Sequence, residues 1–106
     1  MAKYLIQGSY TVDGVKGVLK EGGTGRRNAV ESAVKALGGR LDAFYFALGE
    51  DDVVAIVEAE SNISAATFAM GVAATGTVRT KTTVLLTPEE IDEAAKKTMS
   101  FRAAGQ

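Results

Sequence analysis

The stretch that most constrains the fold runs from Arg40 to Ala59. Two runs rich in β-branched and aromatic residues flank the acidic, glycine-containing segment Gly49-Glu50-Asp51-Asp52. This pattern predicts a β-hairpin, because glycine supplies the positive φ of a tight turn and aspartates bond to nearby backbone. Both faces of the two predicted strands are apolar, so each face must be covered by other parts of the chain or by a partner.

Alternation along the hairpin predicts which residues share a face. Tyr45 and Phe46 are adjacent, so we expect one ring to meet the chain's own helices and the other to meet a partner. The same alternation places Asp42 on the face of Phe44 and Phe46, and Leu41 on the opposite face. In the second strand one face is expected to carry Val53, Ala55, Val57 and Ala59, and the other Val54 and Ile56.

The composition indicates a single globular domain over residues 1–106. A hydrophobic fraction of 46% and a charged fraction of 24% are typical of a chain that buries a core, so disorder is not expected. The chain has no cysteine and no histidine, which excludes disulfides, thiol chemistry and the commonest metal ligand. We therefore expect no metal and no cofactor.

Charge and hydropathy limit the possible partners and locations. The net charge is −1, which provides no general attraction to nucleic acid or to an anionic membrane. No apolar run approaches the roughly 20 residues of a membrane-spanning helix, and the N-terminal residues enter a strand pattern directly. We expect a cytoplasmic protein that binds neither nucleic acid nor membrane.

The segment between the first predicted strand, Tyr4–Tyr10, and the hairpin has helical spacing. Thr11 can cap a short helix, which the glycine-rich run at residues 22–25 interrupts. A stronger helix follows, with Thr24 as its expected cap and Gly38-Gly39 as its end.

Two further elements follow the hairpin. Ser61 or Asn62 is expected to cap a helix that ends at Gly76. The alternating segment Val78–Leu86 predicts the fourth strand.

The start of the last helix has the clearest sequence signal. Thr87 caps it, Pro88 occupies its first turn and Glu90 completes a capping box. The apolar side of this helix carries Ile91, Ala94 and Ala95, and we expect it to be buried. We expect residues 99–106 to form a tail.

The order strand, helix, strand, strand, helix, strand, helix predicts an α+β ferredoxin-like fold, the split βαβ arrangement (βαββαβ plus a C-terminal helix). In this fold a four-stranded antiparallel sheet carries helices on one face. The other face would remain apolar, so we expect a homo-oligomer, a dimer or higher. We place Tyr4, Ile6 and Tyr10 on the helix side, because their opposite face is smaller and more polar.

Several segments, in their order and spacing, resemble the GYD-domain family, a branch of the dimeric α/β barrel, ferredoxin-like superfamily. The family's naming tyrosine falls at Asp51, whereas its glycine and aspartate correspond to Gly49 and Asp52. The resemblance covers about residues 1–97 and implies the fold, but it supplies no activity. The similar segments are residues 21–27, 37–39, 44–59, 78–83 and 86–90.

The glycine-arginine segment is the first candidate binding site. A glycine-rich turn at a helix start exposes amide groups to an anion, and Arg26 and Arg27 add positive charge. The spacing of its glycines matches neither the G-x-x-x-x-G-K-[ST] loop of nucleotide-binding proteins nor the G-x-G-x-x-G loop of dinucleotide-binding proteins. We therefore expect at most weak binding of phosphate, sulfate or a carboxylate. An ordinary turn between helices is the favoured alternative. The candidate residues are Gly23, Thr24, Gly25, Arg26 and Arg27.

The aromatic sheet residues are the second candidate, because rings beside small residues can line a ligand pocket. Core packing and an oligomer interface explain them as well, and are favoured. The acidic run Glu50-Asp51-Asp52 is interpreted as a polar hairpin tip rather than a metal site. The candidate rings are those of Tyr4, Tyr10, Tyr45 and Phe46.

Three functional hypotheses remain open. The leading one is a GYD-like protein that self-associates through its sheet and binds a small or anionic ligand. The second is a cofactor-free enzyme of the isomerase or oxygenase type, which the wider superfamily includes. Asp42 and Glu58 are then candidate bases, although no spacing identifies a catalytic residue. The third is a structural or regulatory subunit whose tail, residues 99–106, docks on a neighbour.

Overall fold

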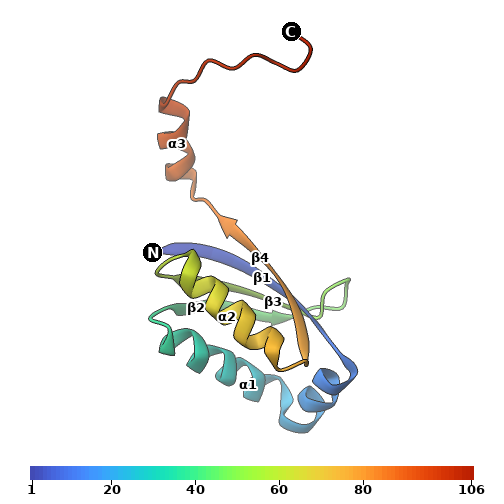
Figure 1. The fold of residues 1–106 in the computed structure, drawn as a ribbon. Helices are drawn as coiled ribbons and strands as arrows, with labels where there is room; N and C mark the ends of the chain where they lie inside the picture. The colour runs from blue at the N-terminus through green and yellow to red at the C-terminus, as the bar shows by residue number, and fades with distance from the viewer.

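The computed structural model describes residues 1–106 as four strands and three helices (Figure 1). The strand order in the sheet is β2-β3-β1-β4, and every neighbouring pair is antiparallel. The predicted α+β split βαβ arrangement with a C-terminal helix is confirmed. No helix is both long and apolar enough to cross a membrane. The elements are β1 (Ala2–Tyr10), α1 (Val12–Ala36), β2 (Arg40–Phe46), β3 (Val53–Ala59), α2 (Asn62–Ala74), β4 (Val78–Leu85) and α3 (Pro88–Lys96).

Helix α1 consists of two helical segments joined across a kink in the glycine-rich run, where the sequence predicted an interruption. Thr11 caps it as predicted, its hydroxyl accepting from the Gly14 amide. The break falls at Gly22, whose φ of 81° and ψ of 167° are not helical, so Thr24 is inside the helix that follows and is not its cap. Gly38 ends α1 with φ 78°, and the Gly39 amide donates to the Val34 carbonyl at 3.0 Å, a left-handed helix end as expected.

The core lies between the sheet and two helices, α1 and α2. Tyr4 is 1% exposed and Ile6 is buried beside it, which confirms the face assigned to β1. Val34 of α1 and Ala65 of α2 complete the cluster with the inward residues of β3. The Tyr4 hydroxyl donates to Asn62 Oδ1 at 2.6 Å, so its polar end is satisfied at the start of α2.

Strand β2 contains a bulge that the alternation could not reveal. The register shifts between Leu41 and Ala43, so that Leu41 pairs with Val57 and Phe44 with Ala55. Leu41 therefore lies on the helix side, and Asp42 projects to the opposite face, where it meets Lys3. The predicted faces of Leu41 and Asp42 were wrong because one extra residue reverses the parity of everything before it.

The second face of the sheet has no helix over it. We call it the open face. Leu5, Val54 and Ile56 are half-buried near its centre, and Tyr45 is 70% exposed at the outer strand. Phe46 lies on the helix side, so the two adjacent rings do point to opposite faces.

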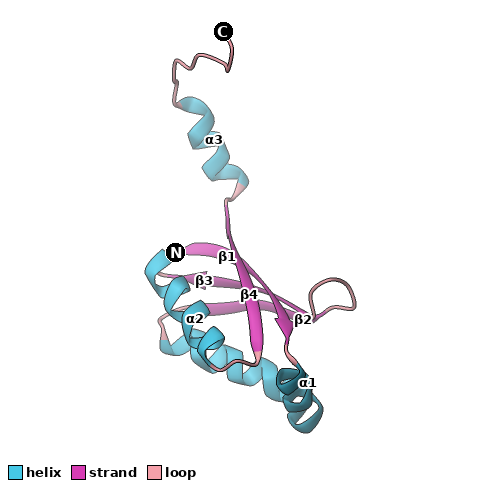
Figure 2. Ribbon diagram, turned by 45° about the vertical axis from the view of Figure 1, so that its right-hand side comes forward, coloured by secondary structure: helices cyan, strands magenta, loops and turns pink.

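The C-terminal arm, residues 87–106, projects away from the sheet (Figures 1 and 2). The capping box of Thr87 and Glu90 is present as predicted. The expected burial of α3 was wrong: none of its residues is buried, and Ile91 is 50% exposed, because the helix has no surface of its own chain to pack on. The radius of gyration is 17.0 Å, against about 13 Å for a compact chain of this length.

Candidate functional site

An apolar pocket lies between α1, α2 and the helix-covered face of the sheet. Its cavity volume is about 60 Å³, below that of sites for drug-sized ligands, so the pocket can enclose only a small group. Among its thirteen lining residues, only Tyr10, Arg26 and Thr80 carry polar side-chain groups. The remaining lining residues are Ile6, Gly8, Val30, Phe44, Val53, Ala55, Val57, Phe68, Val72 and Val78.

The polar end of this pocket is formed by Tyr10 and Arg26. Both residues also line a recess on the other side, with Asp13, Glu21 and Thr77. Arg26 Nη1 donates to Glu21 Oε1 at 2.7 Å, and this bond raises the pKa of the guanidinium. Burial raises the pKa of the Tyr10 hydroxyl, although Arg26 opposes the shift, so the phenol stays protonated at neutral pH. The pocket therefore ends at one cation and one neutral hydroxyl.

The kink in α1 explains how Arg26 reaches the sheet. Gly22 redirects the helix, and Gly23 then passes so close to β2 that a Cβ there would lie 2.9 Å from Cε2 of Phe46. Phe46 in turn meets Phe44 edge to face, with 5.4 Å between ring centroids. The glycine-rich run thus permits close packing of helix on sheet, one turn before Arg26.

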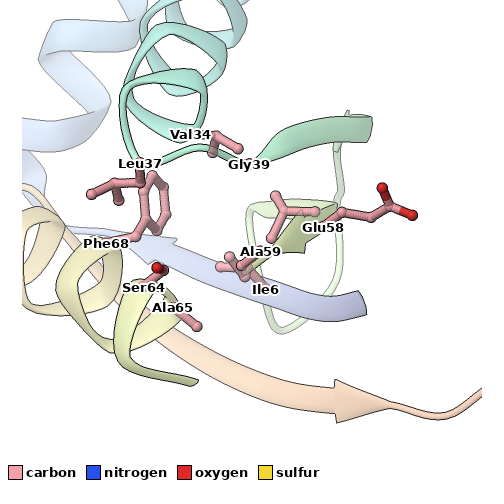
Figure 3. A pocket seen from close by; sticks show the side chains of 10 residues that line it. Ile6, Val34, Leu37, Gly39, Glu58, Ala59, Ser64, Ala65 and Phe68 are labelled. Carbon is pink, nitrogen blue, oxygen red and sulfur yellow. The ribbon is translucent and has the colours of Figure 1, made fainter. Parts of the chain in front are cut away.

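A second, smaller cavity of about 20 Å³ lies at the other end of the interface between the helices and the sheet (Figure 3). Leu37 and Phe68 lie along one side of it, with Ile6 and Ala59 of the sheet opposite, whereas Glu58 points away. Phe68, Ile6 and Val57 line both cavities. This second cavity has no cationic side chain in its lining.

The structure separates the residues of the glycine-arginine candidate. Arg26 lines the pocket and Gly23 packs against Phe46. Thr24 and Arg27 are exposed, and Arg27 Nη2 donates to Asn28 Oδ1 at 3.4 Å. Gly25 is half-buried, and a Cβ there would make ordinary contact with the Glu21 side chain. The candidate anion site is thus reduced to one arginine.

The four candidate rings also divide. Tyr4 belongs to the core, Tyr10 to the pocket, Phe46 to the packing of α1, and Tyr45 to the open face. Sequence reasoning missed the contributions of α2 to the pocket, Phe68 and Val72. The available signal was their helical stripe, which amphipathic spacing assigns to core packing without distinguishing filled from unfilled space.

The acidic hairpin tip fastens the β2–β3 loop to the sheet. Asp51 accepts hydrogen bonds from Gln7 and Ser9, both at 3.2 Å, and pairs with Lys81 at 3.2 Å. Asp52 Oδ2 accepts from the Tyr10 amide at 2.8 Å. Gly49 is exposed with open space around it. The carboxylates that correspond to the family motif therefore have structural partners here.

The two hairpin carboxylates considered as bases are held in an ion-pair network on the open face. Lys3 bonds Asp42 at 2.6 Å and Glu58 at 3.1 Å, and Arg40 bonds the same two residues at 2.7 and 3.1 Å. Lys3 and Arg40 hold the pKa of Asp42 below its usual value. A catalytic base at neutral pH needs a raised pKa, so this arrangement disfavours that role for Asp42.

The strand order, the two covering helices and the sheet define a ferredoxin-like α+β protein with a small apolar pocket under its helices. The GYD domain model matches residues 4–95, and the chain therefore belongs to the GYD-domain family, as its sequence indicated. Comparisons with curated proteins and with solved structures give no match.

Proposed function

We propose that this protein binds a small apolar molecule bearing a carboxylate, in the pocket between α1, α2 and the sheet. The observation that supports this most directly is the contrast within the pocket, where apolar walls meet Arg26 and Tyr10 at one end. A ring or short chain would displace water from the walls, which is favourable in proportion to the apolar area buried.

The carboxylate assignment follows from the chemistry of the polar end. A guanidinium binds a carboxylate through two parallel N–H bonds, and a protonated phenol adds a third donor. Arg26 is half-buried, where such bonds are stronger than in water. An uncharged ligand of the same shape would form no ion pair with Arg26, whose guanidinium would then pair only with Glu21.

Titration with benzoate, followed by NMR of the valine methyl groups, tests this proposal. We expect shifts at Val30 and Val72, which line the pocket, and none at Val54 on the open face. A Kd of about 1 mM would be typical of so small a ligand. Benzyl alcohol, which lacks the charge, should bind at least about tenfold more weakly.

Two adjacent arginines provide a matched control. Arg26→Met keeps the aliphatic stem but removes the charge, and should weaken benzoate binding by about 10- to 100-fold. Arg27→Met makes the same change on an exposed side chain and should leave the Kd unchanged. Equal weakening by both variants, or the absence of shifts in the unmodified protein, would contradict the proposal.

A second function, self-association, is supported by the open face. Its central residues Leu5, Val54 and Ile56 are apolar, and neither helix that packs on the sheet covers them. We propose that a second copy of the chain covers this face, since uncovered apolar sheet surface is a site of association. Sedimentation at micromolar concentration should give at least twice the 11.0 kDa mass of one chain, and a monomer would contradict it.

A further inference from the structure

The C-terminal arm is a formed helix that lacks a surface to pack on. Thr87, Pro88 and Glu90 define its start through the capping box, yet α3 has only nine residues. An isolated helix this short is marginal in water, so packing elsewhere must stabilise it. The apolar side chains Ile91, Met99 and Phe101 are 50%, 78% and 77% exposed. The arm therefore presents an apolar stripe with no cover in its own chain.

The open face offers a surface of the complementary kind. Its centre is apolar, with Leu5, Val54 and Ile56 on neighbouring strands. In the ion pairs of this face, the cationic side chains are more exposed to solvent than the carboxylates. The side chains of Lys3, Arg40 and Lys81 are 39–63% exposed, and those of the paired carboxylates are 14–20% exposed. The rim that a partner would meet thus exposes its cations more than the carboxylates paired with them.

Charge on α3 matches this rim. Four of its nine residues are acidic, and none of the four forms an ion pair in the chain. They flank the stripe of Ile91, Ala94 and Ala95 in the pattern of an amphipathic helix. The apolar stripe of α3, flanked by acidic residues, is therefore complementary to the apolar centre of the open face, which is flanked by cationic side chains. The acidic residues are Glu89, Glu90, Asp92 and Glu93.

We propose that the C-terminal arm of one copy lies across the open face of a second copy, with Ile91 seated near Ile56. Only Leu86 and Thr87 separate β4 from α3, and the arm is directed away from its own sheet (Figure 2). Because each chain carries both surfaces, a two-fold exchange of arms satisfies both and closes the assembly. This inference rests on the proposed self-association and names the segment that covers the face.

Cross-linking tests the arrangement cleanly because the chain has no cysteine. An isotope-labelled Ile91→Cys chain is mixed with an unlabelled Ile56→Cys chain and treated with a short bismaleimide. We expect the cross-linked product, resolved by mass, to contain one chain of each kind. Glu93→Cys, on the opposite side of α3, is the matched control and should cross-link to Ile56→Cys at least about tenfold less.

Three outcomes would overturn the arm exchange, and each can be distinguished from a result in which the protein does not self-associate at all. If Ile56→Cys cross-links to itself as readily as to Ile91→Cys, the two sheets meet directly. If the doubly substituted chain, diluted among unmodified chains, cross-links only within itself, the arm folds onto its own sheet. If Glu93→Cys matches Ile91→Cys, the stripe does not face the partner. A chain that sediments as a monomer would instead remove the self-association on which this inference depends.

Sedimentation of two serine variants measures the strength of association without a cross-linker. Ile91→Ser should weaken association by at least about tenfold, because it removes the central apolar contact of the stripe. Ile63→Ser alters an isoleucine that is 79% exposed on α2 and should leave association unchanged. Both sites are exposed helix positions, so folding should be equally preserved. Equal association by the two variants would contradict the arm exchange.

Discussion

At the scale of single residues, Glu21 determines whether Arg26 is free to meet a ligand. Its carboxylate accepts from Arg26 at 2.7 Å, so a ligand carboxylate would compete with it for the guanidinium. Glu21→Gln removes the competing charge, so benzoate should bind about 3- to 10-fold more tightly. NMR titration measures the change, with Glu31→Gln, farther along α1 and outside every ion pair, as control. An unchanged or weaker Kd in Glu21→Gln would show that Glu21 does not compete.

Asp42 provides a pH-dependent prediction at the same scale. Its pKa is lower in the folded protein than in the unfolded chain, because Lys3 and Arg40 stabilise the charged form. Its contribution to stability is therefore present above the unfolded pKa and is lost as pH falls through the folded pKa. Asp42→Asn should lower the free energy of unfolding by about 0.5–1 kcal/mol at pH 7 and by almost nothing near pH 2.

Urea unfolding at several pH values measures this difference. Glu31→Gln alters a carboxylate of α1 that forms no ion pair and should change stability equally little at every pH. A destabilisation of Asp42→Asn that does not shrink on acidification would contradict the assigned role.

At the scale of elements, the kink in α1 depends on one backbone conformation. Gly22 has φ 81° and ψ 167°, a region almost closed to other residues, with open space where a Cβ would point. Gly22→Ala should therefore lower the free energy of unfolding by about 1–3 kcal/mol through backbone strain alone. Because the kink directs Arg26 to the pocket, the same variant should weaken benzoate binding.

Gly17 is the matched control for that prediction. It also has open space around it, but it lies within the helical part of α1. Gly17→Ala should stabilise the protein by up to about 1 kcal/mol, because alanine has the higher helix propensity. Thermal unfolding of the two variants should thus give changes of opposite sign, and equal signs would show that the kink is not set by Gly22.

At the scale of the whole molecule, self-association links stability to concentration. If folded chains associate and unfolded chains do not, Tm must rise with total chain concentration. We expect a higher Tm at hundreds of micromolar than at a few micromolar, by several degrees for a Kd in the low micromolar range. Calorimetry at both concentrations measures it, and Ile91→Ser should show a smaller rise. A Tm independent of concentration would contradict association in this range.

The sequence by itself determined the elements and their order, because these depend on local signals. The caps at Thr11 and Thr87, the left-handed glycine at Gly38 and the alternation in β3 all appear in the structure as predicted. Each is a property of a few adjacent residues, so the local sequence was enough to predict it. Their order then predicted the split βαβ arrangement, which the family resemblance also implied.

Tertiary structure alone decided everything that depends on residues distant in the chain. The bulge at Asp42 follows from pairing of β2 with β3, and it exchanged the faces of Leu41 and Asp42. The pocket exists because α1 and α2 leave space above Ala55 that no single segment encodes. Amphipathic spacing in α3 predicted a buried side that the structure does not show, because periodicity specifies an apolar face and not what covers it.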